Sequence, residues 1–95
     1  MNDQQLKRSL QSIGMGCFAK HFALFSDRSI SNSAAVDALM VVEKYTESGS
    51  RTRVSQSRRI IREGLAMAAL RIISQSERVD PEWRRKAEDL SNVKL

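Results

Sequence analysis

The sequence contains little of several residue types on which common protein classes depend. Its 95 residues include one cysteine, one histidine and one proline, and only 5% are aromatic. A single cysteine excludes an internal disulfide, and Cys17 and His21 are too few ligands for a structural zinc site within one chain. No apolar run approaches the roughly 20 residues needed to span a bilayer. We therefore expect no metal, no cofactor and no membrane segment.

The first ten residues also lack the apolar core of a secretory signal, because Asp3, Lys7 and Arg8 interrupt them. Together with the lone cysteine, this predicts a cytoplasmic protein. The length predicts one domain over residues 1–95. A chain this short buries only about two thirds of its unfolded surface, so formation of a homodimer would add stability.

Strand patterns are nearly absent, and apolar residues recur instead at helical spacings of three and four. Leu6, Leu10, Ile13 and Cys17 follow one such face. The pattern predicts an all-α protein, a compact bundle of five or six short helices. The expected helices cover 3–13, 16–26, about 32–44, about 51–63, about 65–73 and 81–91.

Local signals mark the starts of three of these helices. Ser31 or Asn32 is placed to cap the third helix, and Ser50 is the expected cap of the fourth. Asp80 followed by Pro81 is typical of a cap and first helical residue.

The core is expected to form around the last two helices. Leu70 and Ile73 lie in a segment that is apolar on too many sides for an exposed helix, and Trp83 and Phe22 each lie on an apolar stripe. We therefore predict that these four side chains are buried.

Positive charge is concentrated in the second half of the chain. Residues 1–50 carry equal numbers of acidic and basic groups, so the whole net charge of +5 resides in residues 51–95. Within this half, residues 51–62 contain five arginines and no acid. Such asymmetry favours a polyanionic partner, and short hydroxyl and amide side chains among the arginines suit contacts to phosphates and base edges. The predicted nucleic-acid-binding residues are Arg51, Thr52, Arg53, Ser55, Gln56, Arg58, Arg59 and Arg62.

The segment from Ala35 to Ile61 resembles a helix-turn-helix unit of DNA-binding domains, with a support helix, a turn containing Gly49 and a polar second helix. The resemblance implies that the second helix enters the major groove of duplex DNA. Its expected connection, residues 44–50, is longer than the usual three or four residues. The resemblance assigns base and phosphate contacts to Arg51, Thr52, Arg53, Ser55, Gln56 and Arg59.

Two other classes of function compete with DNA binding. The arginines are also compatible with a helical protein-interaction module that binds an acidic protein, or with salt bridges across a homodimer. An enzyme is not expected, because no nucleophile elbow, phosphate loop or pair of catalytic carboxylates is present. Cys17 is interpreted as a small core residue and His21 as a partly buried structural residue.

Overall fold

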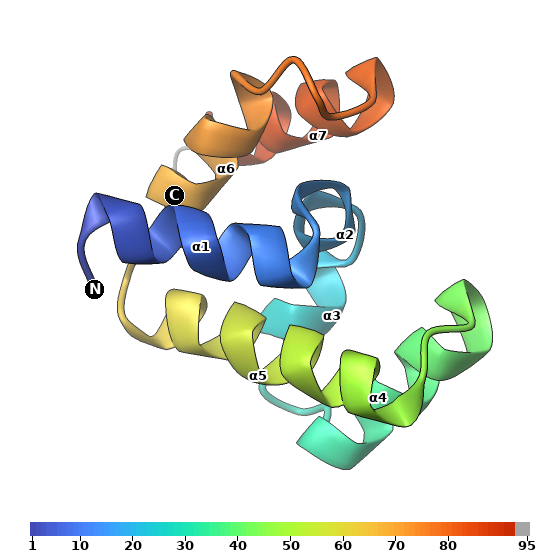
Figure 1. Ribbon diagram of the computed structural model, residues 1–95. Coiled ribbons are helices and arrows are strands. Elements are labelled where there is room, and N and C mark those ends of the chain that lie inside the picture. Colours follow the sequence, from blue (N-terminus) through green and yellow to red (C-terminus); the bar gives the residue numbers. More distant parts are fainter. Residues whose placement is uncertain (93–95) are drawn as a thin grey trace.

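The computed structural model describes residues 1–92 and places seven helices and no strand within them (Figure 1). The all-α prediction is therefore confirmed. One helix more than expected is present because the segment predicted as 16–26 divides at His21 into two short helices. The helices are α1 (Asp3–Ile13), α2 (Met15–Lys20), α3 (Phe22–Ser26), α4 (Asn32–Glu43), α5 (Glu47–Arg62), α6 (Ala66–Ser74) and α7 (Pro81–Ser91).

Helix α1 has well-defined ends. At its start, the Asn2 side chain accepts a hydrogen bond from the Gln5 backbone N–H, and the Gln5 side chain accepts one from the Asn2 backbone N–H. This capping box satisfies two backbone amides that the helix leaves free. The helix ends at Gly14, whose φ of +90° is readily adopted only by glycine. Gly14 thus lies in the gap between the predicted helices 3–13 and 16–26.

A three-residue connection, 44–46, joins α4 to α5. Ser31 caps α4 as predicted, by accepting a hydrogen bond from the Ala34 backbone N–H. The prediction of Ser50 as the cap of α5 was wrong. Thr46 caps this helix, and Ser50 lies inside it with no exposed surface. A threonine cap followed by Glu47 in the first turn suits the positive end of the helix dipole.

Helices α6 and α7 pack against each other as an antiparallel pair (Figure 1). Pro81 is the first residue of α7, as predicted, but the Asp80 side chain accepts no capping hydrogen bond. Proline at this position has no free N–H to satisfy, which reduces the need for such a bond. Lys86 links α7 to α2, because its ammonium donates a hydrogen bond to the Lys20 carbonyl oxygen at 2.7 Å.

The core lies where α1 meets its neighbours, with α5 on one side and the α6 and α7 pair on the other (Figure 1). Leu70 and Ile73 are fully buried, as predicted. Phe22 and Trp83 are only partly buried and pack against the edge of the core. The other large, fully buried apolar side chains include Leu10, Ile13, Phe18, Leu39 and Ile60.

Candidate nucleic-acid interface

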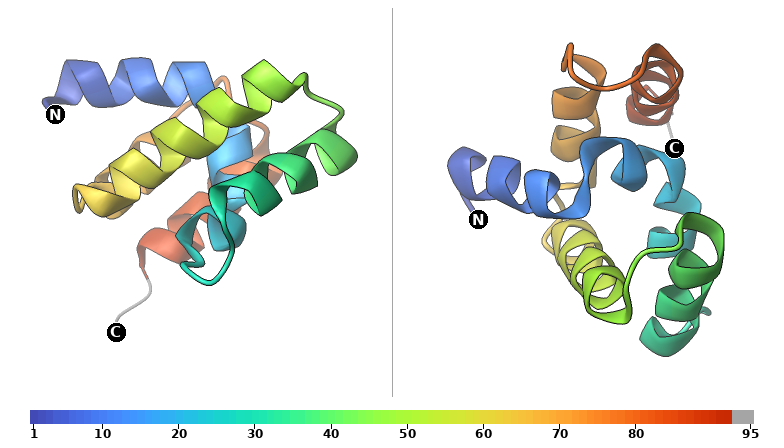
Figure 2. Two further views of the ribbon diagram at one scale, coloured as in Figure 1. Left: turned by 90° about the horizontal axis from the view of Figure 1, so that it is seen from below. Right: turned by 45° about the vertical axis from the view of Figure 1, so that its right-hand side comes forward.

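Helix α5 carries all eight residues predicted to bind nucleic acid, and it packs between α1 and α4. Viewed from below, it crosses the molecule with these two helices on either side (Figure 2, left). Its inner face consists of Ser50, Val54, Ser57 and Ile60, all buried. Because these residues recur every three or four positions, the opposite face of α5 is turned to solvent along its length.

Five of the eight predicted residues share this outer face. The sequence between Glu47 and Glu63 contains no acid. The face extends from residue 51 to residue 62, which is about 17 Å along the helix. We call this surface the arginine face; its exposed residues are Arg51, Thr52, Ser55, Arg59 and Arg62.

Arg58 does not belong to the arginine face, because it is bonded to the C-terminal end of α3. Its guanidinium donates to the carbonyl oxygens of Leu24, Phe25 and Asp27 at 3.2 to 3.3 Å, and to the side-chain oxygen of Asn32 at 2.6 Å. Carbonyl groups at a helix C-terminus lack partners within the helix, and a cation there is favoured by the helix dipole. Arg58 therefore links α5 to the end of α3 and the start of α4.

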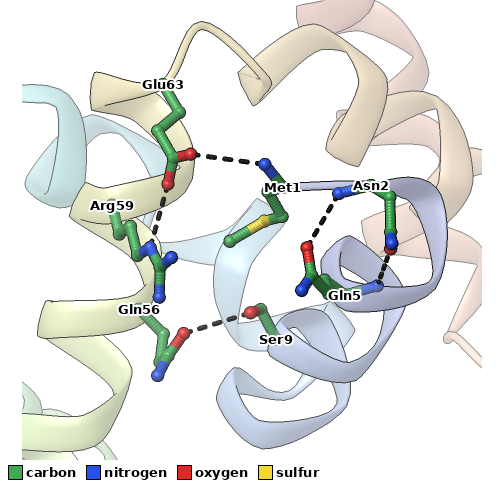
Figure 3. A network of polar contacts seen from close by, with 7 residues as sticks. All are labelled: Met1, Asn2, Gln5, Ser9, Gln56, Arg59 and Glu63. Atoms are coloured by element: carbon green, nitrogen blue, oxygen red, sulfur yellow. Dashed lines mark hydrogen bonds and ion pairs between the residues drawn. The ribbon is translucent and has the colours of Figure 1, made fainter.

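Two further predicted residues are also committed to contacts within the protein. The guanidinium of Arg53 lies over the Tyr45 ring, 3.8 Å from its centroid, and donates to the Gly49 carbonyl oxygen at 3.0 Å. Gln56 accepts a hydrogen bond from the Ser9 hydroxyl at 3.1 Å, which links α5 to α1 (Figure 3). Neither side chain is fully exposed. The structure therefore separates Arg53 and Gln56 from the arginine face.

Two arginines of this face pair with the acids at its ends. Arg51 pairs with Glu47, and Arg59 donates to Glu63 at 2.9 Å (Figure 3). The hydrogen bond from Arg59 lowers the pKa of the Glu63 carboxyl below its usual value. All four side chains are at least one third exposed. Exposed pairs of this kind contribute only about 0 to 1 kcal/mol, so a phosphate can readily replace the carboxylate as partner.

The structure adds two basic residues that the sequence did not assign to the site. Arg8 of α1 lines the same surface depression as Arg59, and Arg28, before α4, lines another with Arg62. Both are exposed. A helical pattern can place Arg8 on the outer side of α1, but it cannot show which helix α1 lies beside.

His21, predicted to be structural, lies in a cluster of charged groups between α2 and α4. Its Nε2 lies 2.8 Å from the Glu43 carboxylate, which also pairs with the Lys20 ammonium at 2.6 Å. Hydrogen bonding from Lys20, and then from His21, lowers the pKa of Glu43. The acid that supports His21 comes from a distant part of the chain, so helical spacing could not reveal it.

Cys17, interpreted as a core residue, is buried as that interpretation requires. Burial raises the pKa of its thiol, which keeps it protonated and poorly nucleophilic at neutral pH. Cys17 is one of the residues that line an open pocket of about 450 Å³, together with Lys20, Glu43 and Trp83. Four charged residues line this pocket, Lys20, Glu43, Arg78 and Asp80, and the first two pair with each other.

Comparison of the chain with models of protein families, with curated proteins and with solved structures found no match. Within residues 1–92, no three His, Cys, Asp or Glu side chains form a group able to hold a metal ion. The same described part of the chain contains no helix that is long and apolar enough to cross a membrane.

Proposed function

We propose that this protein binds nucleic acid, with duplex DNA as the preferred form, through the arginine face of α5. The observation that carries the proposal is the placement of Arg51, Arg59 and Arg62 on one exposed helix face, with no acid in the sequence between Glu47 and Glu63. Guanidinium groups bind phosphate through a fixed fork of N–H donors and also donate to guanine in the major groove. The hydroxyls of Thr52 and Ser55 add short hydrogen-bonding groups to the same face.

The dimensions of this part of the protein suit a duplex. An α-helix with its side chains is about 10 to 12 Å wide, close to the width of the major groove of about 12 Å. The connection between α4 and α5 is three residues long, within the range of helix-turn-helix units. Under this proposal, α4 supports α5, and Arg8 and Arg28 contact the phosphates on either side. The role is binding, in a regulatory setting, without catalysis.

The test is fluorescence anisotropy of a labelled duplex at several salt concentrations. Neither Arg59 nor Arg62 makes a hydrogen bond or ion pair to another helix within residues 1–92, so the double variant Arg59→Ala, Arg62→Ala should fold. Its matched control is Arg71→Ala, Arg85→Ala, which removes the same charge from exposed positions on α6 and α7. We expect the salt slope of binding to fall by about two in the first variant, since each phosphate contact contributes roughly 0.9. The control should retain the wild-type slope.

Two results would overturn the proposal. One is failure of the wild-type protein to bind either duplex or single-stranded RNA at low salt, where even non-specific electrostatic binding is measurable. The other is an equal loss of slope in both double variants, because this would assign binding to the overall charge of the protein. In either case, an acidic protein becomes the better candidate partner for the arginine face. Tighter binding of the RNA than of the duplex would refute the preference for DNA.

A further inference from the structure

Three arginines line one surface depression between the end of α3 and the last turn of α5. Arg28 lies in the segment after α3, whereas Arg58 and Arg62 belong to α5. The volume of the depression is about 380 Å³, within the range of small-ligand sites. We call this surface the α3–α5 depression; its lining includes Phe25, Asp27, Arg28, Arg58, Ile61 and Arg62.

The positive charges of the depression have no ion-pair partners. Arg28 and Arg62 are exposed and make no hydrogen bond or ion pair within residues 1–92. By contrast, Arg51 and Arg59 of the same helix each pair with an acid. Arg58 donates only to carbonyl and amide oxygens, which carry no net charge, so its positive charge is not neutralised by these bonds.

One acid, Asp27, lines the same depression. It accepts hydrogen bonds from the backbone N–H and the hydroxyl of Ser29, at 2.9 and 2.6 Å, and these bonds lower its pKa. Asp27 is therefore ionised, and three arginines with one carboxylate leave an excess of two positive charges. Phe25 and Ile61 add apolar surface to the wall, and low-dielectric walls strengthen the attraction of a charged cleft for a counter-ion.

We propose that the α3–α5 depression binds a phosphomonoester between the guanidiniums of Arg28 and Arg62. Such a group carries a charge of about −1.5 to −2 at pH 7 and three acceptor oxygens, so it matches both the charge excess and two forks of N–H donors. A phosphodiester carries one negative charge and two free oxygens, so it matches the depression less well. The apolar surface of Phe25 and Ile61 is available to the organic group that carries the phosphate.

Phosphomonoesters occur on free nucleotides and at the ends of nucleic-acid strands, and both sources present the same chemistry to the depression. Arg62 belongs to the arginine face as well, so a bound free nucleotide would compete with a duplex for this residue. The competition rests on the proposed function, whereas the site itself does not.

The test is a two-dimensional ¹H–¹⁵N NMR titration of the full chain at low salt with adenosine 5′-monophosphate, and with adenosine as the control ligand. We expect the monophosphate to bind about tenfold more tightly, since adenosine lacks the charge-assisted contacts. Its shifts should concentrate on the amides of residues 25–28 and 58–62. Equal binding of adenosine, or shifts confined to other parts of the protein, would overturn the proposal.

Substitutions test the two arginines directly. Arg28→Ala and Arg62→Ala should each weaken binding of the monophosphate about tenfold, because each removes a charge-assisted contact. The matched control is Arg71→Ala, which removes the same charge from an exposed position on α6 and should keep the wild-type affinity. Circular dichroism of each variant verifies the fold. An equal loss in all three variants would overturn the site, because it would assign binding to the overall charge of the protein.

Lowering the pH from about 7.5 to about 5 tests the charge of the ligand. A phosphomonoester takes up a proton near pH 6, so the affinity for the monophosphate should fall several-fold. The charged groups that face it are Asp27, whose pKa is already lowered, and the three arginines, so none of them changes charge in this range. Sulfate, a dianion at both pH values, should bind equally at both. Unchanged affinity for the monophosphate would refute the preference for a dianion.

A single-stranded trinucleotide with either a 5′-phosphate or a 5′-hydroxyl distinguishes the two sources. The 5′-phosphorylated form should bind more tightly than the 5′-hydroxyl form, and equal binding would overturn the site. If it also binds more tightly than adenosine 5′-monophosphate, the source is the end of a strand; otherwise it is a free nucleotide. No ligand in these titrations is a duplex, so failure of this site is distinct from failure of the arginine face to bind DNA.

Discussion

Arg58 provides a sharp test of the structural argument, because the sequence alone would group it with the DNA-binding arginines. Replacing it with alanine removes four hydrogen bonds, to the end of α3, to Asp27 after it and to the start of α4. Two of these, to the carbonyl oxygens of Phe25 and Leu24, are partly buried. Each such bond contributes about 1 kcal/mol net, and more exposed bonds contribute less. We therefore expect Arg58→Ala to lower the free energy of unfolding by roughly 2 to 3 kcal/mol.

The measurement is urea denaturation followed by circular dichroism at the helical band. Arg62→Ala is the matched control, because this arginine is exposed and makes no hydrogen bond or ion pair within residues 1–92. Its effect should stay within about 0.5 kcal/mol, as for an ordinary surface change. Arg58→Lys should recover only part of the loss, since an ammonium cannot reproduce the fork of a guanidinium. If Arg58→Ala and Arg62→Ala destabilise equally, the proposed structural role of Arg58 is refuted.

Substitutions at Ser57, at the two glycines Gly14 and Gly16, and at Glu43 test the local chemistry of the fold. Ser57→Ala should raise the free energy of unfolding by roughly 0.5 to 1 kcal/mol, because it removes a buried hydroxyl without a partner among the described residues. A lower free energy of unfolding in urea denaturation would contradict this. Gly14→Ala should lower the free energy of unfolding, measured by thermal denaturation, by about 1 to 3 kcal/mol, because alanine is strained at the φ of +90°. Gly16→Ala should lower it by much less, and equal losses would refute the strain argument. The hydrogen bond from Lys20 lowers the pKa of Glu43, so its contribution is present above the ordinary glutamate pKa and is lost as pH falls through the lowered value. Glu43→Gln should therefore flatten the decline of stability below about pH 4.3, and an unchanged pH profile would argue against the pairing.

The faces of α5 show which parts of the site were predictable from the sequence. The apolar positions Val54, Ile61 and Leu65, with Ile60 beside Ile61, were sufficient to predict an amphipathic helix with arginines outside. The structure buries Val54 and Ile60 and leaves Ile61 only partly buried. The sequence pattern could not separate Arg58 from Arg59, since the difference depends on where the end of α3 lies in space. The buried serines at 50 and 57 were also unforeseen, because hydroxyl side chains on a helix are usually exposed.

The sequence of α4 indicates its inner face but not what happens on its outer face. Its inner face includes Val36 and Leu39, both buried. No role could be assigned to Val41 and Val42 from the sequence, because apolar residues in the last turn of a helix can be either buried or exposed. The packing decides between these outcomes, because α4 is covered mainly by α5, which leaves both side chains exposed.

The contrast between Arg58 and Arg62 also determines how any binding experiment must be interpreted. A domain of this size has a stability of about 5 to 15 kcal/mol, so a loss of 2 to 3 kcal/mol leaves nearly all molecules folded. Arg58→Ala should therefore change neither the affinity for a duplex nor its salt slope at moderate temperature. Arg62→Ala should leave stability unchanged and reduce the slope by about one. A protein in which the two substitutions exchanged these effects would have a different face of α5 turned toward its ligand.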